Sequence, residues 1–105
     1  IMENLSIGTD IEDIKRFENK SPEYDKNFLD KIYTPKELEY CYKTKDYAPR
    51  LCARFCGKEA VVKALHGFSI SGIYYKDIEI LNNEKGVPFV KIAQRPDINV
   101  KILIF

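Results

Sequence analysis

Residues 54–64 read RFCGKEAVVKA, and this stretch decides the interpretation of the chain. Apolar residues on both sides of it recur at helical spacing. The pattern predicts a helix from Arg50 to His66, with Gly67 as its terminator and with an apolar stripe formed by Leu51, Phe55, Val62 and Leu65. We expect this to be the central helix of the fold.

Small residues interrupt the predicted helix. Glycine in a helix interior costs about 1 kcal/mol relative to alanine, so Gly57 needs a reason, such as the close approach of a backbone or a ligand. Ala53, Ala60 and Ala64 form a flank of small side chains where another element could also approach.

Two acidic residues of the chain each allow two interpretations. Residues 5–10 are predicted as a short strand ending at Asp10, which could offer its carboxylate to a metal or cap the helix expected from Ile11 to the Ser21-Pro22 break. Glu59 lies four residues before Lys63 on one helix face. That pair could be a surface ion pair or part of a site.

The remaining pattern predicts more helix and then a hairpin. Residues 28–33 are expected as a short helix, and Thr34-Pro35-Lys36-Glu37 carries a capping box that starts another helix running to Lys43. Strands follow at 78–81 and 87–92, with a turn at 82–86, with Pro88 marking an edge or a bulge, and with a final strand at 100–104. The fold class is α+β, one domain over residues 1–105 with helices packed on a small antiparallel sheet.

Composition excludes several classes of protein. The chain has 105 residues, enough for one domain, and 17 basic against 16 acidic residues give a net charge of +1. No basic block indicates nucleic acid, and no apolar run is long enough to span a membrane. Three cysteines without a leader favour a reducing cytoplasm, and Cys52 and Cys56 lack the further ligands of a zinc site.

Two stretches together resemble a known family. Ile7-Gly8-Thr9-Asp10-Ile11 and the later 54–64 stretch are similar to the paired motifs of the 4'-phosphopantetheinyl transferases. The likeness continues through residues 67–82 and Gly86-Val87-Pro88 in the manner of the small holo-acyl-carrier-protein synthases, and it spans about residues 5–92. It implies an enzyme with Mg²⁺ that transfers 4'-phosphopantetheine from coenzyme A to a serine of an apo acyl carrier protein, such as that of fatty-acid synthesis. The second product is 3',5'-ADP.

The resemblance also implies a role for each matching residue. Asp10 and Glu59 correspond to the Mg²⁺ ligands, an interpretation that fits the preference of Mg²⁺ for carboxylates and substrate phosphates. Lys63 corresponds to a lysine beside the phosphate under attack, and these three are the implied catalytic residues. The general base stays open between Glu59, Lys63 and a metal-bound water. Contacts to coenzyme A are implied for Arg54, Lys58, Lys63, Asn83, Gly86 and Pro88.

Partners and assembly follow from the same likeness. Lys15 and Arg16 lie where family members dock the acidic carrier protein, although both could equally be part of a solvated face. Chains of this size in the family are homotrimers with active sites between subunits. Neither nucleic acid nor membrane is an expected partner.

The likeness weakens after Ile92. The Ser-x-Ser-His-type segment of the family and its closing strand are not matched, so the C-terminal strand region is expected to be shortened. Two other hypotheses follow. One is a catalytically impaired relative that only binds coenzyme A or a carrier protein. The other is a small α+β interaction domain whose Glu59–Lys63 pair is only a surface ion pair.

Overall fold

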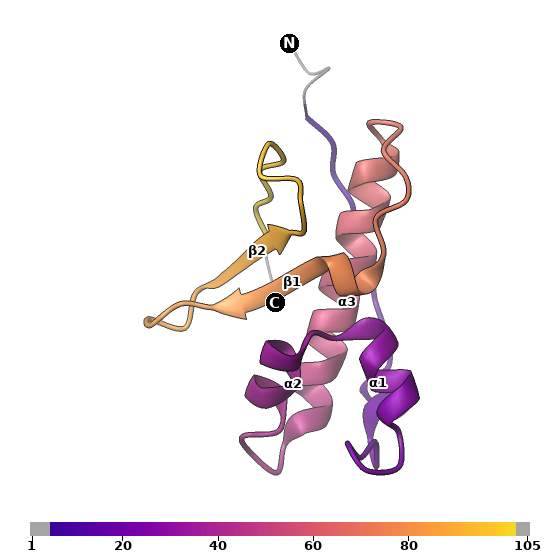
Figure 1. Ribbon diagram of the computed structural model, residues 1–105, viewed down its shortest axis with the longest axis vertical. Coiled ribbons are helices and arrows are strands. Elements are labelled where there is room, and N and C mark those ends of the chain that lie inside the picture. Colours follow the sequence, from indigo (N-terminus) through magenta and orange to yellow (C-terminus); the bar gives the residue numbers. More distant parts are fainter. Residues whose placement is uncertain (1–4, 103–105) are drawn as a thin grey trace.

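The computed structural model describes residues 5–102 and confirms the α+β class, with helices packed on a small antiparallel sheet (Figure 1). No helix within these residues has the length and apolar character to cross a membrane. The elements, in chain order, are η1 (Ile14–Phe17), α1 (Lys26–Ile32), α2 (Pro35–Cys41), α3 (Tyr47–His66), η2 (Tyr75–Asp77), β1 (Ile78–Asn82) and β2 (Pro88–Ile92).

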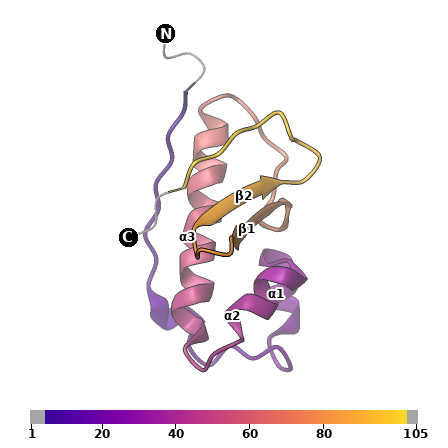
Figure 2. The ribbon, with the colours of Figure 1, turned by 90° about the vertical axis from the view of Figure 1, so that its left-hand side faces the viewer.

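The long helix α3 takes part in two apolar cores (Figures 1 and 2). Its N-terminal half packs with η1, α1 and α2 around Phe17, Leu29, Ile32, Tyr33, Cys41, Ala48, Leu51, Cys52 and Phe55. Its C-terminal half packs with the β1–β2 hairpin around Val61, Leu65, Ile78, Ile80 and Ile92. The helix therefore connects the two cores and fixes everything else relative to its own axis.

Burial on α3 does not follow one stripe. Leu51, Phe55 and Leu65 are buried as predicted, but Val62 is only half-buried and Val61 is buried in its place. Elements cover α3 on several sides, so apolar and charged residues alike end up inside. Gly67 does end the helix, yet with φ −60° rather than in the left-handed conformation of a glycine cap.

The helix α2 begins as its capping box predicts. The Thr34 hydroxyl accepts a hydrogen bond from the Glu37 amide at 3.3 Å, and the Thr34 amide donates to Glu37 Oε1 at 2.9 Å. Pro35 occupies the first helical position, where its missing N–H has no cost. The helix ends at Cys41, two residues before the expected end.

The predicted hairpin is confirmed. The strands β1 and β2 pair antiparallel, with Ile78 opposite Ile92 and Asn82 opposite Pro88. Gly86 has φ +81° in the turn, a conformation that glycine adopts at little cost. Pro88 is the first residue of its strand, a position that tolerates proline.

Predictions for the two ends of the described chain were wrong in part. Residues 5–10 are extended but pair with no strand within residues 5–102, and they run beside α3 instead (Figure 2). The expected helix from Ile11 is reduced to the single 3₁₀ turn η1, capped by Asp13, and Ile11 is 91% exposed.

Val100 and Ile102 pack against the second core without forming a strand. The rest of the expected 100–104 strand, from residue 103, lies outside the described residues.

Two glycines allow the close approaches that the sequence predicts. A Cβ on Gly8 would lie 1.9 Å from Ala60 O and 2.7 Å from Ala64 N, so the extended segment lies directly on the small-residue flank of α3. A Cβ on Gly57 would lie 2.6 Å from the Cδ1 atom of Ile80 and 2.9 Å from that of Ile102. Gly57 thus makes room for two core side chains.

A buried ion pair joins α2, α3 and β1. Lys58 Nζ donates to Glu37 Oε1 at 2.7 Å, and both side chains are 0% exposed. The ammonium also donates to the carbonyls of Tyr75 and Ile78, at 2.8 and 2.6 Å, and Glu37 Oε2 accepts from the Ile80 amide at 3.0 Å. Burial lowers the pKa of Lys58, and the Glu37 charge opposes that shift. The pair is fully hydrogen-bonded, the condition under which buried charges are tolerated.

We expect Gly8→Ala to lower the free energy of unfolding by about 1–3 kcal/mol, the usual cost of overpacking. The new methyl group would overlap the backbone of Ala60 and Ala64, which cannot move without distorting α3. Thr9→Ala, at an exposed neighbouring position, is the control. Urea unfolding followed by circular dichroism measures both variants, and equal stabilities would contradict the packing described above.

Lys58→Met should reduce the free energy of unfolding by about 3–5 kcal/mol, because it leaves the Glu37 carboxylate buried without its counter-charge. The matched control is Lys26→Met, which breaks an ion pair with Asp30 whose side chains are 73% and 42% exposed. That control should unfold close to the wild type. The same urea titration decides. A Lys58→Met protein as stable as the control would show that the buried pair does not hold the fold together.

Candidate functional site

The extended N-terminal segment crosses one face of α3 and brings distant residues together (Figure 2). Lys63 Nζ donates to Thr9 O at 3.1 Å and to Asp10 Oδ1 at 3.0 Å. Further along, the Cys52 thiol donates to Glu12 O at 3.7 Å. The segment therefore runs antiparallel to α3, over the face that carries Cys52, Cys56, Glu59 and Lys63.

Asp10 has one satisfied and one unsatisfied oxygen. Its side chain is 13% exposed, and Oδ1 is paired with Lys63. Its Oδ2 is buried and receives no hydrogen bond from any residue within 5–102. A buried carboxylate oxygen without a partner is costly, so this atom is suited to meeting a cation or a donor from outside the chain.

Glu59 is held from the other side of the site. Its Oε1 accepts a hydrogen bond from the Tyr75 hydroxyl, and the Tyr75 ring packs at 5.4 Å on the Phe55 ring. The hydrogen bond to Glu59 raises the pKa of Tyr75 to about 12, with burial and the charges of Glu59, Asp10 and Glu12 adding to the effect. At neutral pH the hydroxyl is therefore protonated and acts as a donor.

These contacts exclude one of the two interpretations that the sequence left open for each acidic residue. Asp10 does not cap a helix, because Asp13 caps η1 by accepting from the Lys15 amide at 2.9 Å. Lys63 pairs with Asp10 and Glu59 with Tyr75, so the two α3 residues do not form the simple surface ion pair. We call Asp10, Glu59 and Lys63 the carboxylate site.

The carboxylate site fits a hard divalent cation bound with help from a substrate. Among residues 5–102, no group of three or more His, Cys, Asp or Glu side chains is arranged to hold a metal alone. Mg²⁺ commonly takes one or two carboxylates together with substrate phosphates and water. The buried Oδ2 of Asp10 and the oxygens of Glu59 are donors of that type. Burial raises the pKa of the Cys56 thiol to about 11, so it is neither a thiolate ligand nor a nucleophile at neutral pH.

Two of the predicted coenzyme A contacts lie inside the protein. Lys58 is fully buried and its three ammonium hydrogens meet Glu37, Tyr75 and Ile78, so its predicted contact with a phosphate was wrong. The error arose because the motif does not reveal which face of the helix is covered. Arg54 is 5% exposed. Its guanidinium donates to Ile80 O at 3.1 Å and to Asn82 Oδ1 at 2.5 Å. Arg54 thus holds the hairpin against α3 through these hydrogen bonds, and its contact with a coenzyme A phosphate stays a prediction.

The hairpin turn lies apart from the carboxylate site within one chain, since it projects away from α3 (Figure 1). Asn83 shapes the turn, and its Oδ1 accepts from the amides of Lys85 and Val87, both at 2.9 Å. Gly86 and Pro88 complete the corner. Contacts of these three residues with coenzyme A therefore stay a prediction that needs a second subunit.

The predicted docking residues lie at the other end of the extended segment. Arg16 pairs with Glu12 at 2.7 Å, and its guanidinium lies 5.3 Å from the centre of the Phe55 ring. Lys15 is exposed on η1. Carrier-protein docking by these residues stays a prediction.

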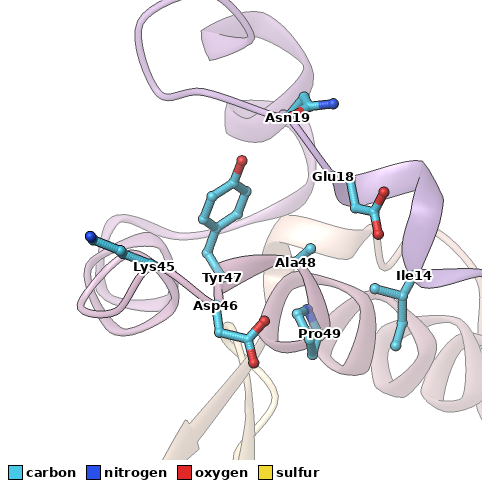
Figure 3. A pocket seen from close by; sticks show the side chains of 8 residues that line it. All are labelled: Ile14, Glu18, Asn19, Lys45, Asp46, Tyr47, Ala48 and Pro49. Atoms are coloured by element: carbon cyan, nitrogen blue, oxygen red, sulfur yellow. The ribbon is translucent and has the colours of Figure 1, made fainter.

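A shallow pocket of about 330 Å³ lies elsewhere, where η1 meets the start of α3 (Figure 3). Figure 3 shows Glu18 and Lys45 on opposite sides of this pocket, with Asp46 between them. Two carboxylates against one lysine make a poor phosphate site. None of the residues of the carboxylate site lines this pocket.

Sequence reasoning missed two residues that shape the site. Tyr75 holds Glu59, and Glu37 was predicted only as part of a capping box although it also pairs with Lys58. Neither contact leaves a sequence signal, because the partners are 16 and 21 residues apart with no periodic relation.

Comparisons with known proteins show which family the chain is similar to. Residues 6–103 match the 4'-phosphopantetheinyl transferase superfamily. The holo-[acyl-carrier-protein] synthase of Protochlamydia amoebophila is 46% identical over 90 residues, which are 85% of this chain and 73% of that protein. That of Halothermothrix orenii is 41% identical over 87% of this chain and 72% of its own length.

Solved structures of such synthases share the fold. The Helicobacter pylori enzyme, in complex with coenzyme A, superposes with a TM-score of 0.69 at 30% identity and covers 85% of this chain and 75% of its own. The Bacillus anthracis enzyme, in complex with coenzyme A (3',5'-ADP), gives 0.68 at 28% identity, covering 87% and 77%. The chain therefore belongs to the 4'-phosphopantetheinyl transferase superfamily, and within it to the holo-[acyl-carrier-protein] synthases.

Proposed function

We propose that the protein transfers the 4'-phosphopantetheine group from coenzyme A to a serine of an apo acyl carrier protein and that it needs Mg²⁺ to do so. The observation that carries this proposal is the carboxylate site, where the buried Oδ2 of Asp10 has no donor within residues 5–102 and Glu59 lies on the same side of α3. The relatives named holo-[acyl-carrier-protein] synthase, and the two solved in complex with coenzyme A, support the choice of substrates.

The proposed reaction balances without a covalent enzyme intermediate. The serine oxygen forms a bond to the β-phosphorus of coenzyme A while the bond from that phosphorus to the 3',5'-ADP oxygen breaks. The leaving group takes the electron pair, and the serine proton passes to a base. Glu59 and Lys63 are both candidates for that base.

Each side chain of the carboxylate site has a definable task. Asp10 and Glu59 would hold Mg²⁺, which when bound stabilises negative charge on the transferred phosphate. Lys63 holds Asp10 in place through Oδ1 and leaves Oδ2 free. Its ammonium, 3.0 Å from Asp10 Oδ1, would also offset negative charge on an incoming pyrophosphate.

Subunit assembly is part of the proposal. Large apolar side chains are exposed along and just beyond the extended segment, and they are Leu5 at 55%, Ile7 at 78%, Ile11 at 91% and Ile14 at 44%. A row of this kind on a soluble protein indicates a surface that a partner covers. We propose that it lies between subunits of a homotrimer, which would also bring the hairpin turn of one subunit toward the site of another.

The transfer is tested by mass spectrometry of an apo acyl carrier protein incubated with this protein, coenzyme A and Mg²⁺. We expect a mass gain of one phosphopantetheine, which EDTA abolishes. Asp10→Ala and Glu59→Ala should each lower the rate by at least about 100-fold, more than the loss of a residue that only orients a metal ligand. Glu23→Ala, at an exposed loop position, should leave the rate unchanged.

A folded wild-type protein that gives no mass gain would refute the transfer. A thermal shift on adding coenzyme A would then identify the impaired, binding-only relative. A mass gain that survives both alanine substitutions would instead show that the carboxylate site is not where the reaction occurs.

The proposed assembly predicts that light scattering after size exclusion gives the mass of a trimer. Ile11→Asp should shift the protein toward the monomer, because it places a charge in the covered surface. Tyr24→Asp changes an equally exposed side chain, 88% exposed and away from that row, and should leave the mass unchanged. A wild-type monomer at micromolar concentration would contradict the assembly.

A further inference from the structure

We infer that Tyr75 is the positioning residue of this site, the group that holds the Glu59 carboxylate in the orientation needed for a metal ion. The inference rests on the proposed function, because it takes Glu59 to be a metal ligand. It assigns a role to a residue that neither motif of the sequence contains.

Tyr75 is fixed at three points. Its hydroxyl donates to Glu59 Oε1, its ring packs against Phe55 with the centroids 5.4 Å apart, and its carbonyl accepts from Lys58 Nζ at 2.8 Å. A tyrosine held by both its backbone and its ring has little freedom to move its hydroxyl. The hydroxyl is therefore a fixed donor, and the carboxylate adapts to it.

Consecutive residues of α3 contact the two ends of this one tyrosine. Lys58 meets the carbonyl and Glu59 meets the hydroxyl, although neighbouring helix residues point about 100° apart. Tyr75 therefore spans the helix surface between them. Through Lys58 it is also connected to the buried ion pair with Glu37, so the orientation of Glu59 depends on a rigid part of the fold.

The hydrogen bond leaves the other oxygen of Glu59 available. A free glutamate on a helix surface samples several rotamers, and a metal must select one of them. A donor on Oε1 removes much of that freedom before the metal arrives, because a hydrogen bond to a metal ligand fixes the orientation of that ligand. Tyr75 touches no reacting group in this arrangement, so it positions Glu59 and takes no part in bond making.

The test compares metal affinities in the presence of coenzyme A and without a carrier protein, so that no turnover occurs. Mn²⁺, which carboxylate sites accept and whose free form is counted by electron paramagnetic resonance, is the probe. Tyr75→Phe removes one oxygen and keeps the ring on Phe55, and we expect it to weaken Mn²⁺ binding about 10-fold. Tyr74→Phe makes the same chemical change at the adjacent, 71% exposed tyrosine and should bind Mn²⁺ like the wild type.

Glu59→Gln completes the design. If Tyr75 acts through Glu59, adding Tyr75→Phe to Glu59→Gln should weaken Mn²⁺ binding no further, so the two changes are not additive. A residue that merely stabilises the fold would lower the melting temperature and leave the affinity unchanged. Melting curves of all variants, followed by circular dichroism, separate those two effects.

The possible failures are distinguishable. Wild-type affinity in Tyr75→Phe, together with a loss of binding in Glu59→Gln, would overturn the inference and leave the proposed metal site intact. Tighter binding in Tyr75→Phe would overturn it as well, because the tyrosine would then compete with the metal. Equal Mn²⁺ binding by the wild type and Glu59→Gln would remove the metal site and the inference together.

Discussion

The Lys58–Glu37 ion pair is the constraint on which the other parts of the structure depend. Both side chains are 0% exposed, so each charge is removed from water, which costs several kcal/mol per ion unless hydrogen bonds replace the lost hydration. The chain provides these bonds from α2, α3, β1 and the turn before it. No single element could provide all of these hydrogen bonds. The ion pair therefore fixes how the elements are arranged relative to one another.

Two adjacent residues of α3 have different roles, one in the buried ion pair and one in the carboxylate site. Lys58 points inward to the ion pair, whereas Glu59 points to the face that the N-terminal segment crosses. One helix can therefore carry a buried lysine and a carboxylate of the candidate site at neighbouring positions, because adjacent positions face directions about 100° apart. Gly8 completes the arrangement by letting the segment lie directly on the helix backbone, which brings Asp10 to Lys63.

The features of the fold that depend on residues close together in the chain were predicted from the sequence. The capping box at Thr34, the turn around Gly86 and the helical spacing from Leu51 to Leu65 each involve residues close together in the chain, and each is found in the structure. The segment 5–10, predicted as a strand, pairs with no strand among residues 5–102, and its apolar side chains are exposed. An unpaired extended segment can have the same alternation as a strand, so the pattern does not distinguish the two. Lys58 was misassigned for a related reason. A helix covered on several sides gives no periodic signal of which charge is buried. That Asp10 and Lys63 belong to one site was implied only by the likeness to a family, because 53 residues separate them, and their ion pair was not predicted.

The charges around the carboxylate site favour the proposed cation. Asp10, Glu12 and Glu59 contribute three carboxylates along one side of α3, and Lys63 and Arg16 offset two of them through ion pairs. One negative charge is left, that of Glu59, and the buried Oδ2 of Asp10 receives no hydrogen bond from residues 5–102. Such a surface repels an anionic pyrophosphate, whereas with a divalent cation it becomes attractive to one. The pairing of Lys63 with Oδ1 adds to this effect, because it neutralises part of Asp10 without occupying the oxygen that a metal would use. Under the proposed function, metal and substrate would therefore favour each other's binding, and the chain alone would hold neither strongly.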